Sequence, residues 1–158
     1  MGQVDVSNIE AVLLIRLTDE QIKFAGTASE FISSGSDTTH LYVIKNSGSI
    51  VGFFKLDLAY SSNCPFCPPD GIGLRAFAID INYLGKRAVK SLIPYINTHY
   101  SMFNWICLTV NCKNQRAKVC YEKGGFESTS ELYLGGLAGP QRIMRVKSSN
   151  QSKYRIII

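Results

Sequence analysis

The stretch VNCKNQRAKVCYEKGGF, residues 110–126, decides the fold. An apolar, β-branched run leads into it and predicts a strand. Residues 115–123 contain neither glycine nor proline and therefore predict a helix. Asn111 and Asn114 are both suitable N-caps for this helix, and Gly124–Gly125 follows where a helix-ending glycine belongs. The stretch thus predicts a strand, a helix, a stop and the start of a second strand.

One face of the predicted helix carries two polar groups. Asn114 and Tyr121 are seven residues apart, nearly two turns, so they lie on the same face about 10 Å apart. This face suits an extended ligand whose reactive atom lies near Tyr121. A phenol with a pKa near 10 is protonated at neutral pH and can donate its proton to a leaving thiolate, whose thiol has a pKa of about 8.5. The alternative is that Tyr121 only packs the helix onto a sheet.

This segment resembles the last signature motif of the Gcn5-related N-acetyltransferases (GNAT superfamily), which typically reads V-N-x-x-N-x-x-A-x-x-x-Y-x-K-x-G-F. The matching residues are Asn111, Asn114, Ala117, Tyr121, Lys123, Gly125 and Phe126. The resemblance implies that Asn114 hydrogen-bonds the pantetheine arm of acetyl-CoA. It also implies that Tyr121 protonates the departing CoA thiolate.

The family's pyrophosphate loop, Q/R-x-x-G-x-G/A, matches less well. The corresponding residues are Leu84, Gly85, Lys86, Arg87, Ala88 and Val89. Leu84 replaces Gln or Arg, Arg87 replaces the first glycine, and Val89 replaces the second small residue. The Arg87 side chain either blocks the close approach of a phosphate or pairs with it. Cations are unfavourable at a helix N-terminus, so Lys86, Arg87 and Lys90 favour an anionic partner; the alternative is a solvated basic turn that binds no phosphate.

The resemblance also implies a site for the thioester. Phe77, Ala78 and Ile79 would lie where a strand bulges and splays from its parallel neighbour. Backbone N–H groups there, foremost that of Ile79, would hold the thioester oxygen. Gly73-Leu74-Arg75 has no carboxylate where many relatives carry a glutamate. The candidate general bases are therefore Asp57, Asp70 and Glu131, each more readily a surface carboxylate, with an ordered water as the alternative.

The rest of the chain predicts a mixed α/β fold. Strands are expected at residues 9–17, 40–45, 50–58, 72–79, 105–111, 126–134 and 142–147. Helices are expected at 18–32, at 85–97 with Pro94 bending or shortening the end, and at 115–123. The order β-α-β-β-β-α-β-α-β-β is that of the acyl-CoA N-acyltransferase (GNAT) fold, with one early helix in place of two. That fold has a mostly antiparallel sheet, one splayed parallel pair and helices on both faces. One domain over residues 1–147 would precede a tail, 148–158.

Composition narrows the partners. The 158 residues carry a net charge of +5 with 18% charged and 46% hydrophobic residues, which is typical of a globular domain. Scattered basic residues argue against nucleic acid as a partner. No stretch predicts a signal peptide or a membrane span, so a cytoplasmic location is expected.

Cys64 and Cys67 form a C-x-x-C pair without a second pair to complete a zinc site, so no metal is expected. A local disulfide and two free thiols both remain open.

The acceptor site is the least defined part. The loop before the 72–79 strand and the Gly135–Pro140 loop are expected at the same edge of the sheet. There Tyr60, Phe66, Tyr133 and Arg142 would either shape an acceptor pocket or plug the sheet end. The resulting prediction is an enzyme that transfers the acetyl group of acetyl-CoA directly to a small-molecule or peptide amine. The alternative is a catalytically silent GNAT-fold binding or regulatory protein, and a homodimer is left open.

Overall fold

The computed structural model describes residues 1–83 and 88–147. The chain forms two compact units, one made of Met1–Ala59 and Leu74–Lys86 and the other of Tyr60–Gly73 and Arg87–Ile158. The prediction of one domain over residues 1–147 stays a prediction. Among the described residues, no helix is long and apolar enough to cross a membrane.

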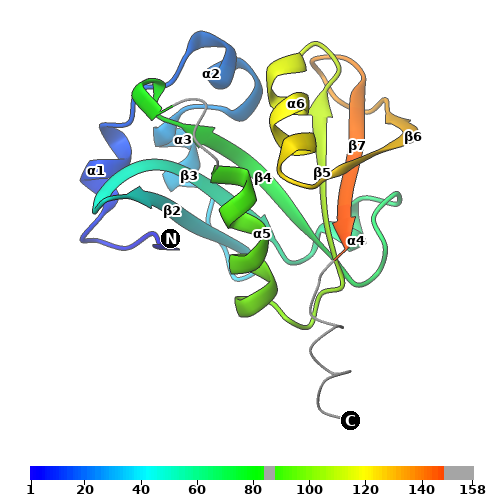
Figure 1. Cartoon of the computed structure of the whole chain (residues 1–158), viewed down its shortest axis with the longest axis horizontal. Helices are drawn as coiled ribbons and strands as arrows, with labels where there is room; N and C mark the ends of the chain where they lie inside the picture. Colours follow the sequence, from blue (N-terminus) through cyan, green and yellow to red (C-terminus); the bar gives the residue numbers. More distant parts are fainter. Residues whose placement is uncertain (84–87, 148–158) are drawn as a thin grey trace. The chain divides into compact units, whose positions relative to one another are not determined.

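Within the described residues, seven strands form one mixed sheet in the order β1-β2-β3-β4-β5-β7-β6 (Figure 1). They are β1 Gly2–Gln3, β2 Thr39–Asn46, β3 Ser49–Asp57, β4 Gly71–Ile79, β5 Trp105–Asn111, β6 Glu127–Tyr133 and β7 Gln141–Lys147. β4 and β5 pair in parallel, whereas β1–β2, β2–β3, β5–β7 and β6–β7 are antiparallel. The predicted sheet, mostly antiparallel with one parallel pair, is confirmed.

The β2–β3 hairpin forms as its turn sequence predicts. Asn46 pairs with Ser49 across the turn. Ser47 and Gly48 both have positive φ, 53° and 85°. Two positive-φ residues between paired strands define the tight turn that best matches strand twist, and glycine adopts this conformation without strain.

Residues 9–17 are not a strand. Helix α1 spans Ile9–Leu13. The first strand of the chain is instead β1, which pairs with the side of β2 away from β3. Val12 and Ile15 are buried in one cluster with Phe31, while Leu14 is 79% exposed. Burial at an i, i+3 spacing is helical. The prediction was wrong because a short continuous apolar run does not distinguish a buried strand from a helix.

The single early helix expected over residues 18–32 is two helices. α2 spans Asp19–Ala25 and α3 spans Ala28–Ile32. Gly26 separates them with φ +87°, a conformation that ends a helix. Thr27 then starts α3 through a capping box with Glu30, in which each side chain accepts a hydrogen bond from the other's backbone N–H.

The described residues of the second unit form three α-helices, α4 (Tyr60–Asn63), α5 (Ala88–His99) and α6 (Gln115–Lys123). Pro94 does not shorten α5, which continues to His99. A proline removes one helical hydrogen bond, here that of the Lys90 carbonyl. Both Pro94 and Lys90 lie on the exposed face, where water can replace the lost bond.

Candidate functional site

Asn114 begins α6 as predicted. Its side-chain Oδ1 accepts a hydrogen bond from the backbone N–H of Ala117 at 3.3 Å. Asn111, the other candidate cap, has a different role: its Nδ2 donates to the Ala138 carbonyl at 3.1 Å, and its Oδ1 accepts from the Lys113 N–H at 2.9 Å. Asn111 therefore fixes the end of β5 to the β6–β7 loop, and Asn114 is the residue that fixes the start of the helix.

Tyr121 lies two turns further along α6, which ends at Lys123. Its ring meets the ring of Phe126 edge-on at 5.7 Å, and its carbonyl accepts from the Phe126 N–H at 3.0 Å. Burial raises the pKa of Tyr121, and the neighbouring Cys120 thiol raises this pKa further. The phenol therefore stays protonated at physiological pH while its ring packs α6 against the following strand. The packing role and the acid role are compatible.

Gly124 and Gly125 end α6 at the predicted position. Gly125 has φ +113°, the left-handed conformation that glycine supplies at helix ends. Gly124 is needed for another reason: a Cβ at this position would overlap Cγ1 of Val89, in the first turn of α5. Val89 is buried, so its side chain points toward α6. The valine, which stands where the family motif has a small residue, is thus accommodated by the glycine that follows α6.

The rest of the predicted pyrophosphate loop is only partly described. Leu84, Gly85, Lys86 and Arg87 lie outside the described residues. Ala88 is half-buried and is the first residue of α5. The role assigned to these residues stays a prediction.

The β4 backbone departs from regular strand geometry just before the predicted thioester site. Ala76 has φ +52°, which is unfavourable for a residue with a side chain and costs about 1–3 kcal/mol. The parallel register of β4 with β5 pairs Gly71 with Trp105 and Gly73 with Cys107. The irregular backbone at Ala76 agrees with the bulge that the resemblance implies for this strand.

The peptide groups of Ile79 are occupied in the first unit. The Ile79 N–H donates to Oε1 of Gln21 at 2.9 Å, and the Ile79 carbonyl accepts from Nε2 of Gln21 at 2.9 Å. The next N–H along, that of Asp80, donates to the Val51 carbonyl of β3 at 2.7 Å. Because successive N–H groups alternate, the Ile79 groups face away from β3. A ligand can use the Ile79 N–H only after the Gln21 amide has left it.

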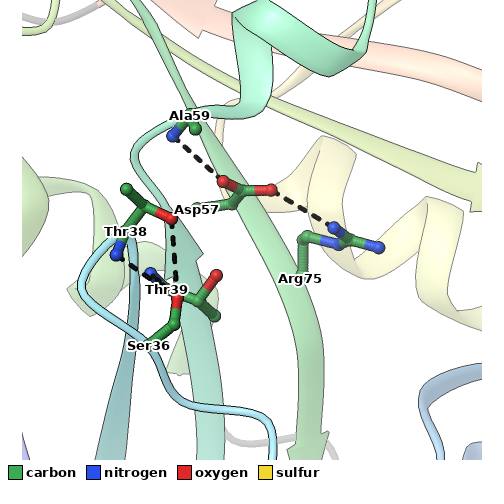
Figure 2. A network of polar contacts seen from close by, with 6 residues as sticks. All are labelled: Ser36, Thr38, Thr39, Asp57, Ala59 and Arg75. Carbon is green, nitrogen blue, oxygen red and sulfur yellow. Dashed lines mark hydrogen bonds and ion pairs between the residues drawn. The ribbon is translucent and has the colours of Figure 1, made fainter.

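Two of the three candidate bases hold the structure together. Figure 2 shows Asp57 at the end of β3, where its carboxylate accepts from Arg75 Nη1 at 3.2 Å and from the Ala59 N–H at 3.0 Å. Asp57 is 6% exposed, so the expectation of a surface carboxylate was wrong for this residue. Asp70 accepts from Asn104 Nδ2 at 2.7 Å.

The same close-up shows how the segment before β2 is ordered. Ser36 Oγ accepts from the backbone N–H groups of Thr38 and Thr39 at 3.3 and 3.1 Å (Figure 2). The Thr38 carbonyl in turn accepts from the Leu58 N–H at 2.8 Å. These bonds extend the pairing of β2 and β3 at the end where Asp57 meets Arg75. The network is structural, since it orders the segment before β2.

The second unit contains a pocket of about 290 Å3. Its lining consists of Phe66, Glu127, Ser128, Thr129, Ser130, Glu131, Ile143 and Arg145. Arg145 comes from β7, and the other polar residues come from β6, where the register with β7 shifts between Ser128 and Leu132. Phe66 contacts the rings of Tyr60 and Tyr133 at 5.9 and 5.6 Å, so three of the four predicted acceptor residues are brought together. Glu131 is the candidate base that lines this pocket.

The two loops expected at one edge of the sheet lie at opposite ends of β5. Gly71, after the first loop, pairs with Trp105 at the start of β5. Gln141, after the Gly135–Pro140 loop, pairs with Asn111 at the end of β5. The expectation was wrong because β7 runs antiparallel to β5. Arg142, which pairs with Val110, is not among the residues that line the pocket.

None of the five cysteines, all of which lie in the described residues, forms a disulfide. Among the residues that the structure describes, no group of three or more His, Cys, Asp or Glu side chains is arranged to hold a metal ion. Of the two alternatives for Cys64 and Cys67, the structure has the free thiols.

No protein-family model and no curated protein sequence matches the chain. Solved structures do match it over nearly its full length. The aminoglycoside acetyltransferase AAC(6')-Ib in complex with coenzyme A superposes with a TM-score of 0.74 and 16% identity, covering 97% of this chain and 96% of that one. The spermidine N-acetyltransferase of Vibrio cholerae in complex with CoA and spermine gives 0.66 and 14%, covering 94% of each chain.

The ribosomal-protein-S18-alanine N-acetyltransferase of Escherichia coli gives a TM-score of 0.63 and 19% identity, covering 94% of this chain and 92% of that one. These neighbours are GNAT acetyltransferases, and the chain has the GNAT fold. At such identities the likeness establishes the fold, and function has to be argued from the site.

Proposed function

We propose that the protein is an N-acetyltransferase that uses acetyl-CoA as co-substrate. The α6 segment carries this proposal. Asn114 caps the helix, and Tyr121, on the same face, presents a phenol that burial keeps protonated. A GNAT fold whose neighbours include structures with bound coenzyme A supports the same reading.

In the proposed reaction a neutral primary amine attacks the thioester carbonyl, and the acetyl group passes directly from sulfur to nitrogen. Tyr121 gives its proton to the departing CoA sulfur. Burial weakens the phenol as an acid, whereas removal of the leaving thiolate from water makes it a stronger base, which favours the proton transfer. The NH2 of Asn114 would donate to a carbonyl of the pantetheine arm, since the side-chain oxygen already serves as the helix cap.

The polar pocket of the second unit is our proposed acceptor site. Glu127 and Glu131 would attract a protonated amine, and the hydroxyl groups between them would orient it. Glu131, or a water molecule beside it, would then accept a proton from the attacking nitrogen. Asp57 and Asp70 are less suitable, because their hydrogen bonds to Arg75 and Asn104 are part of the fold.

A non-catalytic GNAT-fold protein is the second candidate. Two observations favour it. The Ile79 N–H, the proposed thioester donor, is held by Gln21. In addition, Gly73, Leu74 and Arg75 provide no carboxylate, and Arg75 is paired with Asp57. A binding or regulatory protein would need neither an available Ile79 N–H nor a catalytic carboxylate.

Thermal unfolding with and without acetyl-CoA, followed by release of free CoA thiol in the presence of an amine panel, tests the proposal. The panel would contain a polyamine, an aminoglycoside and a peptide with a free N-terminus. A ligand at 100 times its Kd stabilises the fold by about 2.7 kcal/mol, which raises the Tm by several degrees. We expect this shift and amine-dependent thiol release. A folded protein with neither response would contradict an enzyme and leave the non-catalytic candidate.

A further inference from the structure

Three of the five cysteines gather in the second unit, away from α6. Cys64 and Cys67 come from the loop before β4, and Cys107 comes from the middle of β5. They pack in one cluster with Tyr60, Phe66 and Trp105. Cys67 and Cys107 are 6% and 1% exposed, whereas Cys64 is half-buried and accessible at the surface. The cluster therefore has two inner thiols and one outer thiol.

The two inner thiols lie close together in this cluster. The Cys67 thiol donates a hydrogen bond to the Pro68 carbonyl at 3.4 Å. A Cβ added to Gly71 would lie 2.5 Å from the Cys67 sulfur and 3.2 Å from the Cys107 sulfur, so the absence of a side chain at Gly71 lets both sulfur atoms occupy one site. Strand pairing fixes this arrangement, because Gly71 and Gly73 of β4 pair with Trp105 and Cys107 of β5.

The outer thiol is linked to the inner pair by a turn. The Cys67 N–H donates to the Cys64 carbonyl at 3.0 Å, which closes a four-residue turn from Cys64 to Cys67. Prolines at positions 65, 68 and 69 restrict the backbone on both sides of Phe66 and Cys67. The Cys64 and Cys67 side chains are therefore held within a short segment of fixed shape.

The surroundings of Cys107 favour its reactive form. Its interaction with the Cys67 thiol lowers the pKa of the Cys107 thiol, and the Arg145 guanidinium lowers it too, whereas burial, Asp70 and Cys64 raise it; the net shift is downward. Arg145 is the cross-strand partner of Cys107 on β7, and its guanidinium lies over the Trp105 ring at 4.9 Å. A thiolate is the species that attacks a disulfide, so a fixed cation beside Cys107 assists that attack.

We propose that this cluster is a site of reversible thiol–disulfide exchange with small-molecule disulfides, in which Cys64 is the entry thiol and a Cys67–Cys107 disulfide is the product. The proposal is independent of the acetyltransferase function. It rests on the two inner thiols that meet beside Gly71 and on the third thiol next to them, which is only partly buried.

The exchange takes three steps. The Cys64 thiolate attacks a disulfide RSSR, forming Cys64–S–S–R and releasing RS⁻. The Cys67 thiolate then attacks the Cys64 sulfur, releasing a second RS⁻ and forming Cys64–Cys67. Finally the Cys107 thiolate attacks the Cys67 sulfur and releases the Cys64 thiolate. The sum is two protein thiols oxidised to one disulfide and RSSR reduced to two RSH, with Cys64 unchanged.

Alkylation after exposure to oxidised glutathione tests the proposal. The starting protein is Cys112→Ser/Cys120→Ser, which keeps the three clustered thiols. Folded protein is incubated with oxidised glutathione, denatured, treated with N-ethylmaleimide, weighed intact and mapped by digestion. We expect three labels before exposure and one after it, on Cys64, with a Cys67–Cys107 crosslink that dithiothreitol removes. The crosslink closes a loop of about 40 residues and should raise the Tm.

Two further variants in the same background test the order of steps. Cys64→Ser should slow formation of the crosslink at least tenfold, because glutathione cannot reach the buried pair. Cys107→Ala should stop the exchange at Cys64–Cys67 or at a glutathione adduct of Cys64. Three labels after exposure of the folded starting protein would overturn the proposal. A stable Cys64–Cys67 disulfide or a lasting glutathione adduct in that protein would overturn it as well.

Discussion

The α6 helix in the second unit and the end of β4 in the first each carry groups that are predicted to bind the cofactor, and the two regions differ in how these groups are held. On α6 the cap is formed and the Tyr121 phenol is protonated. At the end of β4 the Ile79 N–H and carbonyl are both bonded to the Gln21 amide. Side chains on a short capped helix are positioned by the helix itself. Backbone groups at the end of a strand, in contrast, form hydrogen bonds with whichever polar group lies nearest.

The largest effect is expected at Tyr121. Tyr121→Phe removes the acidic proton and keeps the ring that packs on Phe126. We expect kcat to fall about 100-fold or more, as for loss of a general acid, with the Kd of acetyl-CoA changed less than about twofold. Steady-state thiol release and calorimetry measure the two quantities. Tyr95→Phe, the same change on α5, is the control and should leave kcat intact. Equal kcat in both variants would remove Tyr121 from the chemistry.

The next effect concerns the position of α6. Gly124→Ala places a methyl group on Val89, and overpacking of this kind costs about 1–3 kcal/mol. Urea unfolding should show this loss. Val89→Ala makes room, so the double variant should be more stable than the sum of the two single changes predicts. Strict additivity would mean that α5 and α6 do not meet at this point.

A smaller effect separates the two roles of Asn114. Asn114→Asp keeps an oxygen for the Ala117 N–H but loses the NH2 donor, whereas Asn114→Ala loses both. We expect Asn114→Ala to cost about 1 kcal/mol of stability and Asn114→Asp to cost less, since aspartate is an equally good N-cap. Both variants should weaken acetyl-CoA binding about tenfold, because each loses a hydrogen bond to the cofactor. Asn114→Asp leaves a negative charge in place of the NH2 group, and Asn114→Ala leaves a gap. Unchanged affinity in Asn114→Asp would exclude the amide as a cofactor contact.

The smallest effect tests the strand end. Gln21→Ala frees the Ile79 N–H and carbonyl, so acetyl-CoA no longer has to displace an amide. Hydrogen bonds of this type contribute about 0.5–1.5 kcal/mol each, which corresponds to an affinity gain of about fivefold and a comparable loss of stability without ligand. Calorimetry checks the gain, with Gln3→Ala as a control of the same chemistry on β1. Weaker binding by a folded Gln21→Ala protein would mean that Gln21 supports the site instead of competing for it.

The sequence predicted the parts of the fold that depend on local signals. The Asn46–Ser49 turn and Gly125 after α6 follow from positive-φ conformations that few residues adopt, and the Asn114 cap follows from a side-chain oxygen that accepts from the first turn of the helix. The prediction of a strand at residues 9–17 was wrong, because only the tertiary burial of Val12 and Ile15 distinguishes α1 from a strand. The break between α2 and α3 has a local signal, Gly26-Thr27 followed by Glu30, but the apolar spacing on both sides conceals it.

The candidate site shows the same division. Tyr121 and Asn114 follow from a motif along one helix. The bond between Gln21 and Ile79 joins residues 58 positions apart, and no local pattern encodes such a contact. The pairing of Asp57 with Arg75 and the gathering of Cys64, Cys67 and Cys107 depend likewise on which strands become neighbours. The sequence shows these residue types, and only the fold shows their partners.

Calorimetric titration of the unmodified protein with acetyl-CoA, at two temperatures so that a zero enthalpy cannot hide binding, decides whether α6 serves a thioester cofactor. We predict saturable binding with one molecule per chain and a negative heat-capacity change from the apolar surface that is buried. Folded protein that gives no saturable heat at either temperature would contradict the account.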